Sequence, residues 1–172
     1  MFSNKIKDFI IKNNVKKRLS NVKHLASNDV IKTIGIIFDE SESNDKEGVI
    51  KEIQKFGFQP SQIDFIVFRE KIKKTEVFNY PVFSMKDINW NASFEKNEIK
   101  QFVDKNFDLL ISYYDVEKPA LVLLTHNSKA NFKVGFANVD NRLYHFMIQS
   151  DTKNKVVFTE ELFKYLKILK KI

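Results

Sequence analysis

Four polar side chains stand directly after short apolar runs, and they are the first candidates for chemistry in this sequence. Asp39 and Ser41 follow the first run, Arg69 follows the second, and Asp115 follows the third. Parallel strands present their carboxyl ends at one edge of a sheet, and ligands bind beyond that edge. The four residues therefore predict a ligand site for a nucleotide, a phosphosugar or a metal ion.

The familiar catalytic and cofactor motifs are missing from the chain. Asp39 lacks the second aspartate two residues later that phosphoaspartyl transfer enzymes of the haloacid dehalogenase type carry. Four glycines form neither of the Gly-rich phosphate-binding motifs, the three histidines have no metal-binding spacing, and Ser112 lacks the flanking glycines of a nucleophile elbow. We therefore expect no catalytic residue, no cofactor and no metal ion.

The charge of the chain is concentrated at its two ends. The net charge is +7, with +6 in residues 1–33, −3 in residues 34–152 and +4 in residues 153–172. Such asymmetry is typical of proteins that contact nucleic acid or anionic membranes. We expect several cations to face nucleic acid, and two of them lie in a segment around Phe132 in which basic and aromatic residues are interleaved. These cations are Lys5, Lys12, Lys16, Lys17, Arg18 and Lys23 near the N-terminus, and Lys129 and Lys133 beside Phe132.

Each of these signals has a plainer interpretation. Lysine supplies 26 of the 29 cations, whereas detailed phosphate recognition favours arginine, so the basic ends are also explained as solvated surface. The alternation of Phe132, Val134 and Phe136 also fits a strand with phenylalanine inward and lysine outward. The acidic loop that begins at Asp39 is equally explained as a solvated loop before a helix.

The alternation of apolar patterns predicts the fold. Continuous β-rich runs at 34–38, 64–68, 109–113 and 132–136 indicate strands that are buried on both faces, with further strands at 81–83 and 142–148. Helices are predicted near 49–56, over 93–107, from Pro119 and from Thr159. This order predicts a three-layer α/β sandwich with a mostly parallel, doubly wound, Rossmann-like sheet over residues 31–172.

Residues 1–30 are predicted to form a basic helical arm, as two helices or one kinked helix. Phe2, Ile6, Phe9 and Ile10 share a face opposite Lys5 and Lys12. That pattern suits a membrane surface, but it also suits a helix docked on the sheet, which is the commoner outcome. The sequence does not decide between docking and projection.

Two segments carry a resemblance to a known family. The segments 109–114 (LLISYY) and 128–136 (SKANFKVGF) resemble a conserved family of uncharacterised proteins from flavobacteria and their relatives, and the similarity runs along most of the chain. That resemblance implies no catalytic residues.

The favoured hypothesis is a non-enzymatic binding protein that associates with RNA or ribosomes through its basic termini, with a protein partner as a further option. The alternative is a small-ligand or enzymatic domain that uses the strand ends. The chain has no cysteine and no apolar run near the roughly 20 residues of a membrane span, so the expected location is the cytoplasm.

Overall fold

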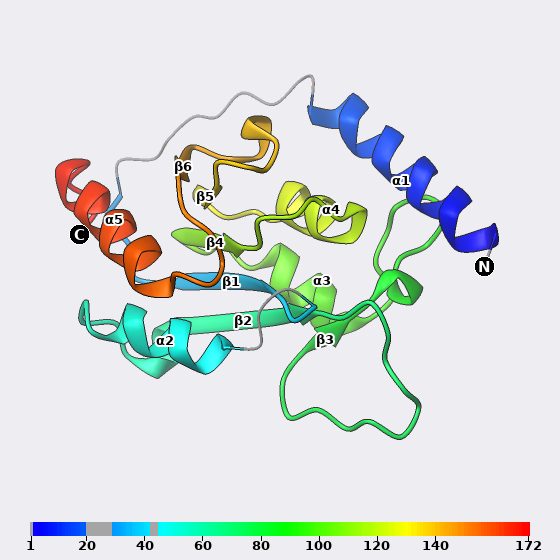
Figure 1. Cartoon of the computed structure of the whole chain (residues 1–172), viewed down its shortest axis with the longest axis horizontal. Helices are drawn as coiled ribbons and strands as arrows, with labels where there is room; N and C mark the ends of the chain where they lie inside the picture. The colour runs from blue at the N-terminus through cyan, green and yellow to red at the C-terminus, as the bar shows by residue number, and fades with distance from the viewer. Residues whose placement is uncertain (1, 20–28, 42–44) are drawn as a thin grey trace.

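A single parallel sheet forms the centre of the molecule. The structure is a computed structural model that describes residues 2–19, 29–41 and 45–172. Within these ranges six strands lie in the order β3-β2-β1-β4-β5-β6, and every neighbouring pair is parallel (Figure 1). The strands are β1 (Ile34–Asp39), β2 (Ile63–Phe68), β3 (Val82–Phe83), β4 (Leu109–Tyr113), β5 (Phe132–Phe136) and β6 (Phe146–Ile148).

Helices cover both faces of this sheet. The α-helices of the described ranges are α1 (Phe2–Leu19), α2 (Lys46–Gln54), α3 (Asn97–Asp104), α4 (Pro119–Asn127) and α5 (Lys155–Ile168). One apolar cluster joins α1, α3 and α4 to the sheet, and a second cluster joins α2 and α5 to its other face. The predicted three-layer, Rossmann-like α/β fold is therefore confirmed.

The central strands are apolar along their whole length because both faces are covered. In β1, Ile34, Ile36 and Phe38 point into the cluster beneath α2 and α5, and Ile37 points into the cluster beneath α4. All six residues of β1 are buried. This double burial explains why the run is continuous in the sequence and does not alternate with polar residues.

Several predicted elements differ from the structure at their ends, and three of them differ most. The predicted strand over 142–148 is only β6, because a short 3-10 turn (Asn141–Leu143) precedes it. Helix α3 begins at Asn97 and not at Ser93, because Phe94 forms a β-bridge with Ile88. Helix α5 begins at Lys155, four residues before the predicted start.

The N-terminal helix docks on the body of the protein. Helix α1 is one continuous helix, it lies against α4, and its Ile11 is completely buried in the cluster beneath α4. The Nζ atom of Lys7 donates a hydrogen bond to the carbonyl of Met85 at 3.0 Å. No helix in the described ranges is long and apolar enough to cross a membrane. The division near residue 30 stays a prediction, since residues 20–28 lie outside the described ranges.

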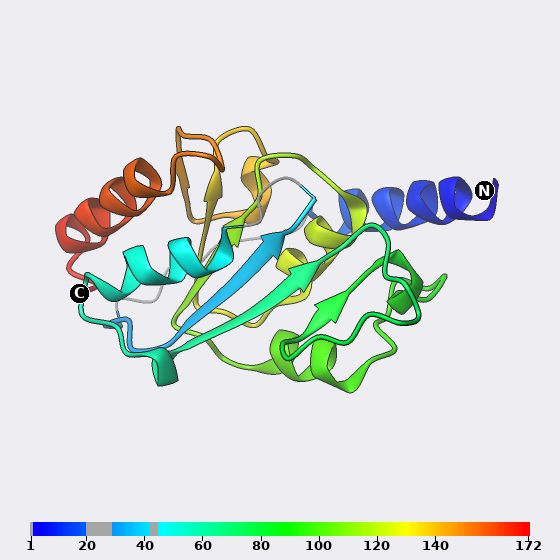
Figure 2. The same cartoon turned by 60° about the horizontal axis from the view of Figure 1, so that its bottom comes forward.

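The helices of the two basic ends of the chain lie apart, although the segments beside them meet. Helix α5 lies beside α2 on one face of the sheet, whereas α1 lies beside α4 on the other (Figures 1 and 2). The backbone carbonyl of Lys171 is held by Ile31 N–H at 2.8 Å, at the start of β1. If the basic termini act together, as the RNA-binding hypothesis implies, their lysines should form one patch. This part of the hypothesis is wrong for α1 and α5, because the sheet separates the two helices.

Gly135 in β5 is required by a close approach of Tyr144. A Cβ atom at this position would lie 2.3 Å from the Cζ atom of that buried ring. We expect Gly135→Ala to lower the free energy of unfolding by about 1–3 kcal/mol, as overpacked cores do. Urea denaturation measures this loss. The double variant Gly135→Ala/Tyr144→Leu should show favourable coupling, and strict additivity would contradict the contact as the cause.

Candidate functional site

The candidate site lies at the carboxyl edge of the sheet, between β1 and β4. The chain leaves β1 toward β2 on one side and leaves β4 toward β5 on the other, so the strand order reverses here. Open α/β sheets bind ligands at such a switch point. Asp39 ends β1, and Lys118 is the residue before α4. Their side chains meet in this crevice, with Lys118 Nζ 2.7 Å from Asp39 Oδ2.

This ion pair is enclosed by its neighbours. The side chain of Asp39 has no solvent-exposed surface, and that of Lys118 is 14% exposed. Ser41 donates its hydroxyl to Asp39 Oδ1 at 2.5 Å and its backbone N–H to the same atom at 3.0 Å, and its Oγ also contacts Lys118 Nζ. Glu70 reaches Lys118 Nζ at 3.2 Å from the solvent side. Lys118 is thus held between an inner and an outer carboxylate.

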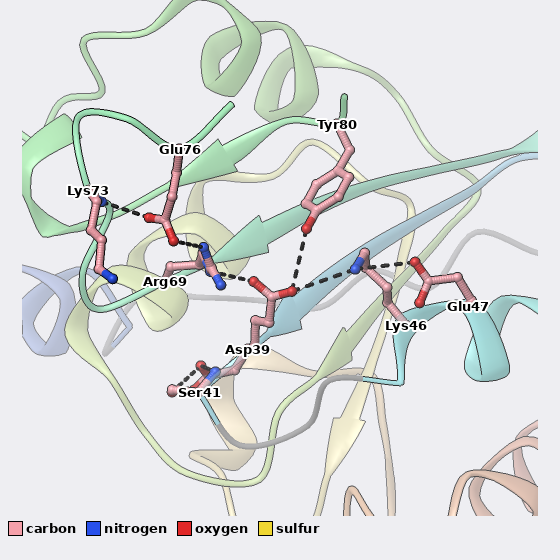
Figure 3. A network of polar contacts seen from close by, with 9 residues as sticks. Asp39, Ser41, Lys46, Glu47, Arg69, Lys73, Glu76 and Tyr80 are labelled. Atoms are coloured by element: carbon pink, nitrogen blue, oxygen red, sulfur yellow. Dashed lines mark hydrogen bonds and ion pairs between the residues drawn. The ribbon is translucent and has the colours of Figure 1, made fainter. Parts of the chain in front are cut away.

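A second network of charges continues from the first. Figure 3 shows Arg69 between two carboxylates. Tyr80 and Lys46 contact the inner of these carboxylates from the side away from Arg69. Arg69 Nε lies 2.5 Å from Glu40 Oε2, and Arg69 donates to Glu76 Oε1 at 3.3 Å. Tyr80 donates its hydroxyl to Glu40 Oε1 at 3.4 Å, and Lys46 lies over the Tyr80 ring at 4.5 Å. Arg69 therefore repeats the arrangement at Lys118, with one inner and one outer carboxylate.

A shallow hollow opens beside Arg69, and Ser41 and Glu70, two residues that contact Lys118, also line it. It has a volume of about 300 Å³. Its lining residues are Glu40, Ser41, Arg69, Glu70, Lys71, Lys73 and Glu76. Three carboxylates and three cations thus surround a space that is large enough for a small molecule.

The electrostatics of Lys118 favour binding over base catalysis. Burial disfavours its charged form, but the close carboxylates of Asp39 and Glu70 outweigh burial and raise the pKa of Lys118 above its ordinary value. The amine is therefore an ammonium at neutral pH, and it cannot take a proton from Ser41. Among the described residues no group of histidine, aspartate and glutamate side chains is arranged to hold a metal ion. Each of the two cations already has two carboxylate partners, so an anion can bind them only by replacing one of these carboxylates.

The structure brings together three of the four residues predicted for this ligand site. Asp39, Ser41 and Arg69 lie in the two networks described above. Asp115 is engaged elsewhere, because its Oδ2 accepts hydrogen bonds from the backbone and hydroxyl of Thr152 at 3.1 and 3.3 Å. The buried carboxylate of Asp39 also shows that the interpretation of a solvated loop is wrong for this residue.

Sequence reasoning missed the partners of these residues. Lys118 immediately precedes Pro119, at which the sequence predicts the start of a helix. The N-terminal end of a helix carries partial positive charge, so a cation there is unfavourable unless an anion balances it. That unfavourable placement was an available signal that Lys118 has an anionic partner. Glu76 and Tyr80 carry no such signal, because they belong to an irregular segment between β2 and β3.

The candidates for nucleic-acid contact are dispersed. Lys12 and Lys17 are exposed on α1. Lys5, Lys16 and Arg18 also belong to α1, but their side chains lie outside the described structure, as does the whole of Lys23. Lys129 is exposed at the end of α4 and pairs with Asp104 at 2.7 Å.

Lys133 lies in the interior, so the interpretation of outward lysines on β5 is wrong for it. Its side chain points to the face of the sheet that α4 covers. There its Nζ atom donates hydrogen bonds to the carbonyls of Thr125 at 2.8 Å and His126 at 3.2 Å. These carbonyls end α4, so the ammonium caps the negative end of that helix. Burial lowers the pKa of Lys133 to about 8.

The fold and the site define the class: an α/β domain with a doubly wound parallel sheet and an ion-pair network at its carboxyl edge. Within that class, the chain belongs to a family of unknown function, DUF6913, whose model matches residues 7–169. No curated protein and no solved structure matches the chain. Membership of an uncharacterised family is thus confirmed, and its range of organisms stays a prediction.

Removing Lys118 should expose the cost of a buried, unpaired carboxylate. We expect Lys118→Met to lower the free energy of unfolding by about 3 kcal/mol, because Asp39 loses the cation that balances it. The double variant Asp39→Asn/Lys118→Met should recover much of that loss. Urea denaturation at neutral pH measures both. Equal losses in the single and double variants would contradict the ion pair as the cause.

The buried amine of Lys133 should make stability depend on pH. Its pKa is lower in the folded protein than in the unfolded chain, so the unfolded chain binds more protons between pH 8 and 10.5. The free energy of unfolding should therefore rise with pH in this window, by about 2 kcal/mol between pH 7.5 and 9.5. Lys133→Met should lose this rise in urea denaturation. Parallel profiles of the variant and the parent protein would exclude Lys133 as its source.

Proposed function

We propose that this protein binds a small anionic molecule at the carboxyl edge of its sheet, with Lys118 and Arg69 as the two cations that receive the anionic groups. The observation that carries the proposal is the buried Lys118–Asp39 ion pair at the switch point of the sheet. A titratable group whose pKa is shifted by burial and by a specific charged partner is a candidate for a functional site, and Lys118 is such a group.

The inner and outer carboxylates differ in a way that supports this function. Asp39 and Glu40 are almost completely buried, with side chains 0% and 9% exposed. Glu70 is 60% exposed and Glu76 is 32% exposed, and both lie in the segment between β2 and β3. The more exposed carboxylate is the easier one to replace, so an anionic ligand can displace Glu70 at smaller cost than Asp39, whereas Glu76 is also held by the backbone N–H of Lys73 at 2.7 Å. The inner carboxylates then hold the cations in place.

The ligand class follows from the geometry of the two cations. Arg69 offers a planar guanidinium, which suits a carboxylate or a phosphate, and Lys118 offers a single ammonium. The shared chemistry is an anionic group of either kind. The raised pKa of Lys118 and the absence of a recognisable nucleophile–base pair among the described residues favour binding without reaction.

Ligand binding is tested by thermal unfolding with inorganic phosphate, malonate and a nucleoside diphosphate as probes. At least one probe should raise the melting temperature, because a ligand that binds only the folded state stabilises it. Glu70→Gln removes a competing carboxylate and should tighten binding of that probe several-fold. Lys118→Met should weaken it about tenfold or more, since a hydrogen bond to a charged group is lost.

Lys105→Met is the matched control, because this exposed lysine pairs with Asp64 away from the hollow. It should leave the affinity unchanged. Absence of a shift with every probe in both the parent protein and Glu70→Gln would overturn the proposal, and the second variant keeps the test independent of any folding defect in Lys118→Met.

Association with RNA stays a prediction from the charge of the termini. The separation of α1 from α5 and the interior position of Lys133 remove two of its supports. What supports it still is the exposed lysine content of α1, and RNA binding is therefore an outcome in the experiment on that helix below.

A further inference from the structure

Helix α1 turns apolar side chains toward solvent. Ile6 is 50% exposed and Phe9 is 65% exposed, whereas Ile11 is completely buried against the body of the protein. At about 100° per residue, Ile6 and Phe9 stand on the side of the helix opposite Ile11. The side chains that the sequence predicted as a docking stripe therefore include two that do not dock.

Cations flank this apolar pair. Lys12 and Lys17 are exposed, and the helical repeat places one on each side of Ile6 and Phe9. Exposed apolar side chains with cations beside them are one feature of helices that lie in the headgroup layer of a bilayer.

We infer that the outward face of α1 binds the surface of an anionic membrane, with Phe9 and Ile6 entering the boundary of the acyl chains and the lysines contacting lipid headgroups. The helix would lie parallel to the bilayer and stay docked on α4 through Ile11. This surface is separate from the ligand site, so it does not depend on the proposed function.

Charge complementarity selects the membrane over a second copy of the chain. A symmetric dimer through this face would place identical lysines near one another, and juxtaposed like charges oppose association. An anionic bilayer is complementary to these lysines. RNA also complements the lysines, and its bases can stack on the exposed ring of Phe9, but RNA gains no stacking surface from Ile6. The single variant Ile6→Gln therefore separates the two partners, because it should weaken binding to a membrane and leave binding to RNA unchanged.

The test is cosedimentation of the full chain with vesicles of phosphatidylcholine alone and of phosphatidylcholine with about one-third phosphatidylglycerol. We expect binding to the anionic vesicles, and binding should fall with added salt. Ile6→Gln/Phe9→Gln should lower the partition coefficient about tenfold or more, and Lys12→Glu should lower it about fivefold or more.

Two controls come from α5 on the opposite face of the sheet. Ile168→Gln changes an apolar residue of similar exposure, and Lys167→Glu changes an exposed lysine. Both should leave vesicle binding unchanged, and the α1 variants should retain the parent melting temperature because the changed residues are exposed.

Three results would overturn the inference. The first is no binding to anionic vesicles. The second is equal loss in the α1 and α5 variants. The third is a protein that does not bind vesicles but binds another partner through this face. Such a protein would self-associate as its concentration rises, or it would be retained on RNA in a way that is lost in Lys12→Glu and kept in Ile6→Gln.

Discussion

A buried carboxylate, that of Asp39, constrains everything at the carboxyl edge of the sheet. It lies at the end of the central strand β1, where no water reaches it, so it needs a cation and hydrogen-bond donors from the protein. Lys118 supplies the charge, and the backbone and hydroxyl of Ser41 supply the donors. The pair fixes the start of α4 against the end of β1, and it defines the crevice between the two halves of the sheet.

The same edge shows how a binding site can be prepared by its own side chains. Two cations, Lys118 and Arg69, each face a buried carboxylate that holds them and an exposed carboxylate that balances them. The buried partners fix the positions of the cations before any ligand arrives. Because the outer partners are already partly solvated, replacing them requires little desolvation. A ligand can therefore approach the two cations from the solvent side, where the outer carboxylates lie.

The sheet itself decides which surfaces can act together. It places the helices of the two basic ends on opposite faces, where α1 lies with α4 and α5 lies with α2. Both ends of the sequence are basic, but the lysines of the two helices therefore lie on two separate surfaces of the protein. On α1 the burial of Ile11 directs Ile6 and Phe9 outward, so a helix with apolar residues on several sides presents some of them to solvent.

The apolar pattern of the chain was enough to predict the sheet and the residues at its strand ends. The runs at β1, β4 and β5 were predictable because strands covered on both faces must be apolar throughout, and a parallel sheet brings Asp39, Ser41 and Arg69 to one edge. The folded chain was needed to see that Lys118 balances Asp39, that Lys133 caps α4 and that Asp115 accepts hydrogen bonds from Thr152. These partners lie far apart in the chain or depend on which way a side chain leaves a strand, and local residue patterns do not encode that information.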